Sequence, residues 1–322
     1  MNILITSAGK RVSLVKFFQK EIKAVRPESK VFVADLNPHL SAAAQISDGA
    51  FKVPPVNSSG YLSKITEICK TNNISLIIPT IDTELIVLAK NEQLLLNNGI
   101  KPVISSVSFI NKCRDKRKIH EFFKAHNINV AKEFPKDRYK LPLFIKPVDG
   151  SRSTDTFIIL KEDELVEYHF KNEKLMFLEY LDRDVYEEFT CDLYYSKDSK
   201  LKCVVPRKRI EVRDGEVNKG KTEKNILISY IKEKLYHIPG AKGCLTAQFF
   251  KHKENNHIIG IEINPRFGGG FPLSYLAGAN YVRWIIEEYL LDKNIDECMD
   301  CWENNLLMLR YDNEILVHEY KS

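Results

Sequence analysis

The sequence predicts an α/β protein, with a parallel α/β domain at the N-terminus and a mixed α+β region after it. Two patterns predict this class. Over residues 1–110, short apolar runs alternate with amphipathic helical segments, and beyond residue 140 the apolar runs follow one another across short polar turns. Strands that alternate with helices form right-handed βαβ units in a parallel sheet, whereas strands joined by turns pair in antiparallel fashion.

Four strands are expected in the N-terminal part, and an amphipathic helix over Val12–Ile22 follows the first of them. The turn Thr6–Arg11 has one glycine where the dinucleotide-binding fingerprint needs three, so a structural turn is favoured over an NAD site. In an NAD enzyme, Asp35 would bind a ribose hydroxyl. The expected strands are Asn2–Thr6, Val31–Ala34, Ile74–Pro79 and Pro102–Ser105.

Polar residues follow the third strand at its carboxyl end, where open sheets bind ligands. Asp82 and Glu84 therefore either face a substrate or cap the next helix. Further along, Leu143–Pro147 is a strand that carries Lys146, and a small polar turn at 150–154 leads to the next strand. We expect a hairpin here whose tip closes over phosphates. The basic cluster Arg207–Arg209 is either a solvated face or an anion-binding wall.

The densest chemistry lies between residues 244 and 270. Two strands, Leu245–Phe250 and Ile258–Asn264, are expected to pair, and a period of two places Glu262 and Asn264 on one face. Gln248 of the neighbouring strand completes an all-oxygen set, which suits Mg²⁺. Arg266 follows, and the glycines at 268–270 would let the backbone approach a bulky anion.

The composition is that of an ordinary globular protein. The 322 residues include 48 Lys and Arg against 43 Asp and Glu, a net charge of +5, with 44% hydrophobic residues. This length indicates two or three domains, and the composition argues against disorder, collagen and coiled coil. The mild, dispersed charge argues against nucleic-acid binding. Neither a membrane span nor a secretory signal is evident, so we expect a cytoplasmic protein without a membrane partner.

Seven cysteines are scattered along the chain, an odd number that predicts reduced thiols rather than a disulfide framework. Cys298 and Cys301 form the one close pair. A zinc site would need a second pair or histidines at ligand spacing, and none follows. Two thiols near a helix end are the favoured interpretation.

Together these segments resemble the ATP-grasp superfamily, in particular proteins similar to one half of the carbamoyl-phosphate synthase large subunit. The resemblance covers nearly the whole chain, and the order and spacing of its motifs are specific. The strongest match is the sequence GIEINPRFGGG at 260–270. The other matching segments are Ile3–Arg11, Asp115–Lys116, Phe144–Pro147, Glu188–Asp192 and Pro206–Arg209.

The resemblance implies three units and a set of binding residues. Residues 1–110 would form a pre-ATP-grasp domain, 111–178 a small lid subdomain, and 179–322 a large subdomain with a Mg²⁺ or Mn²⁺ site. ATP would be bound by two phosphate-binding cations, lid-loop serines, an adenine-binding hinge and a ribose-binding acid. These nucleotide-binding residues are Lys116, Lys146, Ser151, Ser153, Glu179, Tyr180, Leu181 and Glu188.

The resemblance also implies where the metal binds and where the reaction occurs. Gln248, Glu262 and Asn264 match the metal-binding face, and Arg266 matches the arginine that steadies the transferred phosphoryl group. Lys219 lies where relatives have a cation near the γ-phosphate. Arg207, with Arg209, is the candidate for holding the carboxylate of the acceptor.

The implied activity is an ADP-forming ligase that joins a small carboxylate to an amine through an acyl phosphate. Two alternatives stay open: kinase-like phosphoryl transfer to a small molecule, and a nucleotide-binding protein without turnover. The second is favoured by the glycine-poor lid loop at 150–156, which carries Asp155 near the expected phosphates. Ammonia drawn from glutamine would need a partner protein, and homodimers are common among such enzymes.

Overall fold

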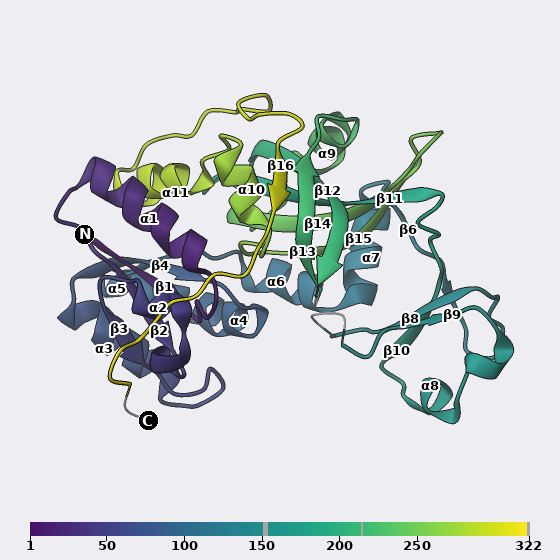
Figure 1. The fold of residues 1–322 in the computed structure, drawn as a ribbon, viewed down its shortest axis with the longest axis horizontal. Helices are drawn as coiled ribbons and strands as arrows, with labels where there is room; N and C mark the ends of the chain where they lie inside the picture. Colours follow the sequence, from purple (N-terminus) through teal and green to yellow (C-terminus); the bar gives the residue numbers. More distant parts are fainter. Residues whose placement is uncertain (151–153, 214, 321–322) are drawn as a thin grey trace.

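Three sheets follow one another along the chain, each covered by helices (Figure 1). The computed structural model describes residues 1–150, 154–213 and 215–320, and within this part the sheets have five, four and seven strands. The expected succession, a parallel sheet domain followed by two further α+β units, is confirmed. No helix in the described residues combines the length and the apolar character needed to cross a bilayer.

The N-terminal domain is a parallel sheet with the strand order β3-β2-β1-β4-β5. Its central strand is buried on both faces: Ile3 and Ile5 pack in one core with Phe18, and Leu4 packs in another with Ile65. Three of the expected strands are present, and the fourth lies at Lys101–Pro102 instead of Pro102–Ser105, so that only Pro102 is shared. The elements are β1 (Asn2–Thr6), α1 (Val12–Val25), β2 (Val31–Asp35), α2 (Ala42–Gln45), β3 (Ala50–Lys52), α3 (Tyr61–Thr71), β4 (Ile74–Pro79), α4 (Asp82–Lys90), α5 (Glu92–Asn97) and β5 (Lys101–Pro102).

The four-stranded sheet is small and antiparallel, with the order β7-β10-β8-β9. It has a core of its own, made by residues such as Leu143, Ile145 and Phe177. The expected hairpin is confirmed, because β8 and β9 pair with Leu143 opposite Ile159. The elements are β7 (Glu133–Phe134), β8 (Leu143–Pro147), β9 (Phe157–Ile159), α8 (Glu167–Lys171) and β10 (Leu175–Glu179).

The seven-stranded sheet has the order β16-β13-β12-β11-β14-β15-β6 and is antiparallel except for β6, which pairs parallel to β15. Two helices that precede the small sheet pack on this sheet instead: the Phe123 ring lies 5.9 Å from that of Phe249. The elements are α6 (Val107–Arg114), α7 (Lys116–Ala125), β6 (Asn129–Val130), β11 (Tyr186–Tyr195), β12 (Leu201–Arg213), β13 (Glu216–Thr222), α9 (Leu227–Leu235), β14 (Gly243–His252), β15 (Ile258–Asn264), α10 (Phe271–Leu276), α11 (Tyr281–Leu290) and β16 (Leu307–Leu309).

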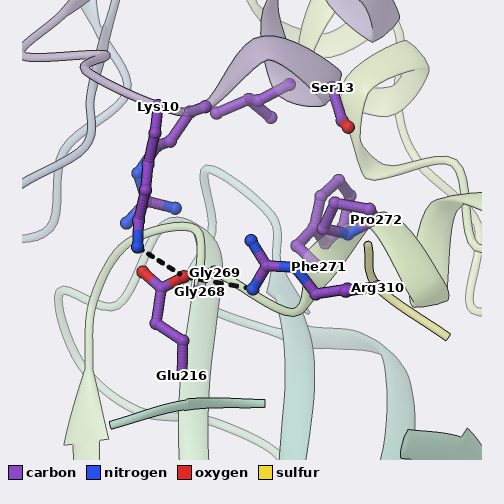
Figure 2. Close-up of a pocket in the computed structure, with 10 residues that line it drawn as sticks. Lys10, Ser13, Glu216, Gly268, Gly269, Phe271, Pro272 and Arg310 are labelled. Carbon is purple, nitrogen blue, oxygen red and sulfur yellow. Dashed lines mark hydrogen bonds and ion pairs between the residues drawn. The ribbon is translucent and has the colours of Figure 1, made fainter. Parts of the chain in front are cut away.

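The N-terminal domain and the large sheet meet at a small cavity of about 40 Å³ (Figure 2). Glu216, the first residue of β13, lies between two cations. Lys10 of the β1–α1 turn approaches its carboxylate at 3.4 Å, and Arg310, just after β16, at 3.1 Å. Three segments distant in the sequence are therefore held at one point by charge.

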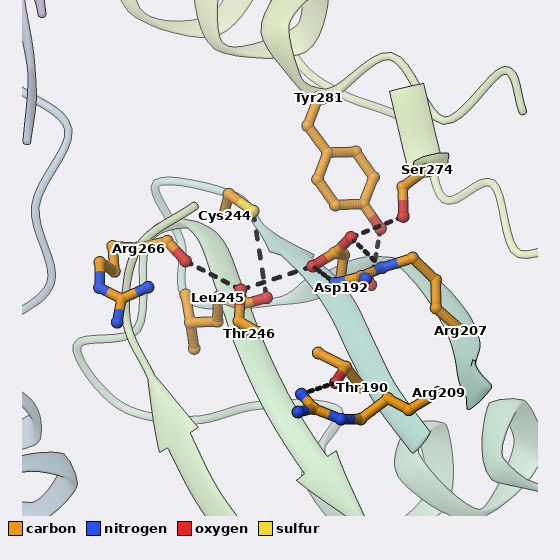
Figure 3. A network of polar contacts seen from close by, with 10 residues as sticks. All are labelled: Thr190, Asp192, Arg207, Arg209, Cys244, Leu245, Thr246, Arg266, Ser274 and Tyr281. Atoms are coloured by element: carbon orange, nitrogen blue, oxygen red, sulfur yellow. Dashed lines mark hydrogen bonds and ion pairs between the residues drawn. The ribbon is translucent and has the colours of Figure 1, made fainter. Parts of the chain in front are cut away.

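A buried polar network lies at the centre of the large lobe (Figure 3). Asp192 of β11 is fully buried and accepts two hydrogen bonds from the guanidinium of Arg207 on β12, at 2.8 and 3.0 Å. The hydroxyl of Ser274 on α10 donates to the same carboxylate at 2.6 Å, and that of Thr246 on β14 at 3.4 Å. Tyr281 of α11 donates to the Asp192 carbonyl at 2.8 Å. One carboxylate thus ties three strands and α10 together.

Replacing Asp192 by Asn should lower the free energy of unfolding by about 3–5 kcal/mol, because it leaves the Arg207 charge buried without its counter-ion. Chemical denaturation measures the change. Asp312→Asn is the matched control, because it breaks an Arg213–Asp312 pair whose side chains are 60% and 77% exposed. Exposed pairs contribute little, so the control should unfold like the unmodified protein. Equal effects in the two variants would contradict the central role of Asp192.

Candidate functional site

A cleft of about 1390 Å³ opens where the three sheets meet. Its walls come from the β1–α1 turn, the start of α4, the small sheet and the strands β11, β12, β14 and β15. Ser151 and Ser153 lie outside the described residues, and Lys219 does not line the cleft. The other residues expected from the sequence do line it: Lys116, Lys146, Glu179, Tyr180, Leu181, Glu188, Arg207, Gln248, Glu262, Asn264 and Arg266.

Two buried lysines meet at the junction of the small and large sheets. Lys116 begins α7, and its ammonium donates to the Gly150 carbonyl at 2.6 Å, while Lys146 extends from β8. Burial lowers the pKa of Lys146 to about 8 because a buried ammonium loses hydration; Glu262 opposes this shift and the Lys116 charge adds to it. Burial lowers the pKa of Lys116 as well, again opposed by Glu262.

Lys146 is 6% exposed, and within the described residues its ammonium has neither a hydrogen bond nor a salt bridge. The Phe144 ring lies 5.9 Å away. A buried cation is unfavourable unless an anion or several acceptors surround it. The position of Lys146 in the cleft therefore favours an anionic ligand.

Gln248, Glu262 and Asn264 lie together as the period of the strands predicts. Gln248 is directly opposite Glu262 across the β14–β15 pair. Both amide nitrogens donate to the same oxygen, Glu262 Oε1, Gln248 at 3.2 Å and Asn264 at 2.8 Å. Each amide oxygen is thus left for another partner. One carboxylate and two amide oxygens are hard donors, a set that fits Mg²⁺ when phosphate oxygens and water complete its coordination.

Another part of the cleft wall is formed by Glu179–Leu181, in the segment that joins the small sheet to β11, and by Glu188 of β11. Glu179 pairs with Lys132 through two hydrogen bonds of 2.9 Å, and the Tyr180 amide donates to the Pro142 carbonyl at 3.3 Å. Glu188 of β11 lies between two guanidinium groups, those of Arg209 at 3.0 Å and Arg183 at 3.5 Å. Arg209 is therefore held by a carboxylate from within the chain.

Arg266 connects the large sheet to the N-terminal domain. Its guanidinium donates to both carboxylate oxygens of Asp82 at the start of α4, at 2.9 and 2.7 Å. Asp82 faces the cleft, whereas Glu84 is fully buried and accepts hydrogen bonds from the hydroxyls of Tyr61 and Ser7. Burial raises the pKa of Glu84 to about 7. Neither carboxylate accepts a capping hydrogen bond from the first amides of α4, so the capping interpretation is wrong for both.

The β1–α1 turn is fixed from within, as a structural turn should be. The Asp35 carboxylate accepts from the amide of Gly9 at 3.2 Å and from that of Asn37 at 3.2 Å. Asp35 therefore serves the turn itself.

Two of the residues expected to take part in catalysis form ion pairs with carboxylates of the chain itself. Arg207 borders the cleft, but its guanidinium is hydrogen-bonded to the carboxylate of Asp192. Lys219 of β13 pairs with Glu211 at 2.7 Å, away from the cleft. The glycines at 268–270 also serve packing: a Cβ at Gly270 would lie 2.1 Å from Arg207 Nη1, and one at Gly268 would lie 2.8 Å from Thr246 Oγ1.

His120 is a cleft residue that the sequence analysis missed. It lies one helical turn after Lys116 on α7 and is buried. Burial lowers its pKa to about 4, and the Lys146 charge acts in the same direction. The spacing of four residues from Lys116, which places both on one face of the helix, was the available signal.

Two protein families match separate parts of the chain. Residues 3–103 match the family described as the PylC-like N-terminal domain, and residues 171–303 match the family described as ATP-grasp in the biosynthetic pathway with Ter operon. Comparison with curated protein sequences found no match.

Solved structures of the same fold cover nearly the whole chain. The biotin carboxylase domain of Hydrogenobacter thermophilus 2-oxoglutarate carboxylase, in complex with MgADP, ADP and bicarbonate, is 13% identical with a TM-score of 0.71, over 95% of this chain and 73% of that one. An L-amino acid ligase from Bacillus licheniformis is 16% identical with a TM-score of 0.67, over 90% and 74%.

Rhizobium etli pyruvate carboxylase is 11% identical with a TM-score of 0.70 over 95% of this chain, which spans 30% of that longer protein. At these identities the likeness establishes the fold. The ATP-grasp resemblance inferred from the sequence is confirmed. Residues 3–103 are therefore similar to PylC-like N-terminal domains and residues 171–303 to ATP-grasp domains, and nearly the whole chain shares its fold with these solved structures.

Proposed function

We propose that this protein is a Mg²⁺- and ATP-dependent ligase that joins a carboxylate to an amine, with ADP and phosphate as the other products. The observation that carries the proposal is the pair of buried lysines, Lys116 and Lys146, which share the carboxylate of Glu262. Asp149 and Asp82 also act on Lys116, but they pair with Lys174 and Arg266, so the two buried ammonium groups keep a surplus of positive charge. The β- and γ-phosphates of ATP would neutralise that surplus.

The rest of the nucleotide would extend from the lysines toward Glu179–Leu181 and Glu188. These residues line the same cleft. By the ATP-grasp resemblance, the adenine would lie on Glu179–Leu181 and the ribose hydroxyls would bind Glu188. The Hydrogenobacter structure of the same fold contains MgADP and bicarbonate, which supports a nucleotide in a cleft of this architecture.

Gln248, Glu262 and Asn264 would hold the metal ion. Their amide oxygens are not used by the hydrogen bonds within the set, and one carboxylate with phosphate oxygens is a usual environment for Mg²⁺. When bound, the ion neutralises phosphate charge and orients the triphosphate. Mn²⁺ prefers similar oxygen ligands and would bind the same residues.

The reaction would proceed in two displacements. A carboxylate oxygen of the acceptor attacks the γ-phosphorus, the bond to ADP breaks, and an acyl phosphate forms. The amine then attacks the acyl carbon, phosphate leaves with the bonding electrons, and the amine loses a proton as the amide forms. Neither step needs a nucleophilic side chain, so positioning and charge neutralisation by Lys116, Lys146 and Arg266 are what the protein would supply.

The acceptor side of the cleft would be the region around Arg266 and the N-terminal turn. Arg266 lies two residues after Asn264 and reaches Asp82 of the N-terminal domain. Lys10 and Arg11 of the β1–α1 turn line the same cleft. These cations support an acceptor that carries a carboxylate. We place the reaction in the cytoplasm, with ATP, a small carboxylate and an amine as its substrates.

The ligase proposal predicts that Glu262→Gln lowers ADP release by about 100-fold, because it removes the charged metal ligand and keeps the shape of the side chain. The assay supplies MgATP with pools of small carboxylates and amines, and mass spectrometry identifies the amide. Glu211→Gln is the matched control, since Glu211 lies on β12 outside the cleft. A Glu262→Gln variant with unchanged ADP release would contradict the metal assignment, and a phosphorylated product without an amide would contradict the ligase.

The buried position of Lys146 predicts that ATP binding takes up protons at high pH. With a pKa of about 8, Lys146 is largely neutral at about pH 9 in the free protein and charged at about pH 6.5. Phosphates favour the charged form, so binding should take up close to one proton at about pH 9 and almost none from Lys146 at about pH 6.5.

Titration calorimetry in buffers of different ionisation enthalpy measures this uptake. Lys146→Arg is the control, because a guanidinium stays charged at both pH values. The variant should bind ATP without the uptake at about pH 9. The same uptake in both proteins would show that Lys146 does not face the phosphates.

A further inference from the structure

Three cysteines gather outside the cleft, where the segment after α11 packs on β12. Cys203 belongs to β12, and Cys298 and Cys301 belong to that segment. The amide of Cys298 donates to the Lys202 carbonyl at 2.7 Å, which fixes the segment to the strand. The thiol of Cys301 donates to the carbonyl of Cys298 at 3.3 Å, and the thiols of Cys203 and Cys298 lie within hydrogen-bonding reach of its sulfur.

The three thiols differ in exposure. Cys203 is fully buried, Cys298 is half-buried and Cys301 is exposed. The thiols of Cys203 and Cys298 can therefore both donate to the most exposed of the three sulfurs, that of Cys301. Such an arrangement stabilises a thiolate, which is the reactive form of cysteine.

The charges of the cluster follow from this arrangement. The hydrogen bond from Cys203, the largest effect, and that from Cys298 hold the pKa of Cys301 at about 6. Burial raises the pKa of Cys298 to about 11 and that of Cys203 well above its ordinary value. Near neutral pH, Cys301 is then mostly thiolate, whereas an ordinary cysteine is mostly protonated.

We propose that Cys301 is a site of reversible thiol oxidation by low-molecular-weight disulfides, and that Cys298 is its resolving partner. The Cys301 thiolate attacks one sulfur of the disulfide, a mixed disulfide forms, and one small thiolate leaves. Cys298 loses its proton to solvent and attacks the Cys301 sulfur, and the second small thiolate leaves. The two cysteines are oxidised to one disulfide, and the small disulfide is reduced to two thiols.

Cys298 is assigned as the resolving partner because of its exposure and its place in the chain. Two residues separate it from Cys301, so the bond closes a very short loop at little cost in chain entropy. It is in partial contact with solvent and can lose a proton there. Cys203 is fully buried in the core of β12 beside Tyr281, and its attack would require that core to open.

The test is a peptide map of the full chain after incubation with oxidised glutathione near neutral pH. Remaining thiols are alkylated in acid quench, and the bonds are read by mass spectrometry without reduction. We expect a Cys298–Cys301 disulfide in the unmodified protein and a stable glutathione adduct on Cys301 in Cys298→Ser. In Cys301→Ser, neither product should form. The buried Cys69 and the half-buried Cys113 serve as internal controls and should stay reduced.

Two results would overturn the proposal. Equal modification of Cys301→Ser and the unmodified protein would show that Cys301 is not the site of attack, and a Cys203–Cys301 disulfide in the folded protein would remove the assigned role of Cys298. Neither readout depends on the proposed ligase activity.

Alkylation rates test the thiolate separately. At pH 7, iodoacetamide should label Cys301 at least about 10-fold faster than Cys113, the pKa of which burial raises well above its ordinary value. Cys203→Ala removes the main hydrogen bond to Cys301 and should slow its labelling at about pH 6.5. A rate for Cys301 no higher than that for Cys113 would contradict a stabilised thiolate.

Discussion

The buried ion pair between Asp192 and Arg207 is the constraint on which the large lobe depends. Side chains from β12, β14 and α10 all donate hydrogen bonds to the carboxylate of Asp192. This one group therefore holds the helix in place against the strands. The pair also determines the nearby backbone, because Gly270 passes so close to the guanidinium that only a residue without a Cβ fits. The packing of Arg207 is therefore one reason why the segment after Asn264 needs glycine, apart from any ligand that it binds.

A second constraint is the distribution of charge in the cleft. Several cations of the cleft have partners inside the chain, such as Arg209 with Glu188 and Arg266 with Asp82. Lys146 stands apart because its ammonium is buried and, in the described chain, unpaired. Attraction for an anion is thus concentrated at the junction of the small and large sheets, beside the oxygen donors of β14 and β15.

The sequence was informative wherever structure follows from local periodicity. A strand period of two places Glu262 and Asn264 on one face, and the pairing of neighbouring strands brings Gln248 opposite Glu262. The same reasoning had no means of pairing Arg266 with Asp82, 184 positions away, or Arg207 with Asp192. Arg207 and Lys219 looked equally available in the sequence, because partners that neutralise a cation are fixed by tertiary packing and leave no local pattern.

The small sheet has mechanical independence from the rest of the molecule. Its core, built on residues such as Leu143, Ile159 and Phe177, shares no member with the cores of the other two sheets. Turning this sheet as a rigid body would therefore open the cleft and, in the described part of the chain, leave each of these core clusters whole. The hydrophobic effect then opposes such a rotation weakly, so the energy of opening is set largely by polar contacts with α7, such as those of Lys116 with the Val148 and Gly150 carbonyls and the Arg117–Glu133 pair.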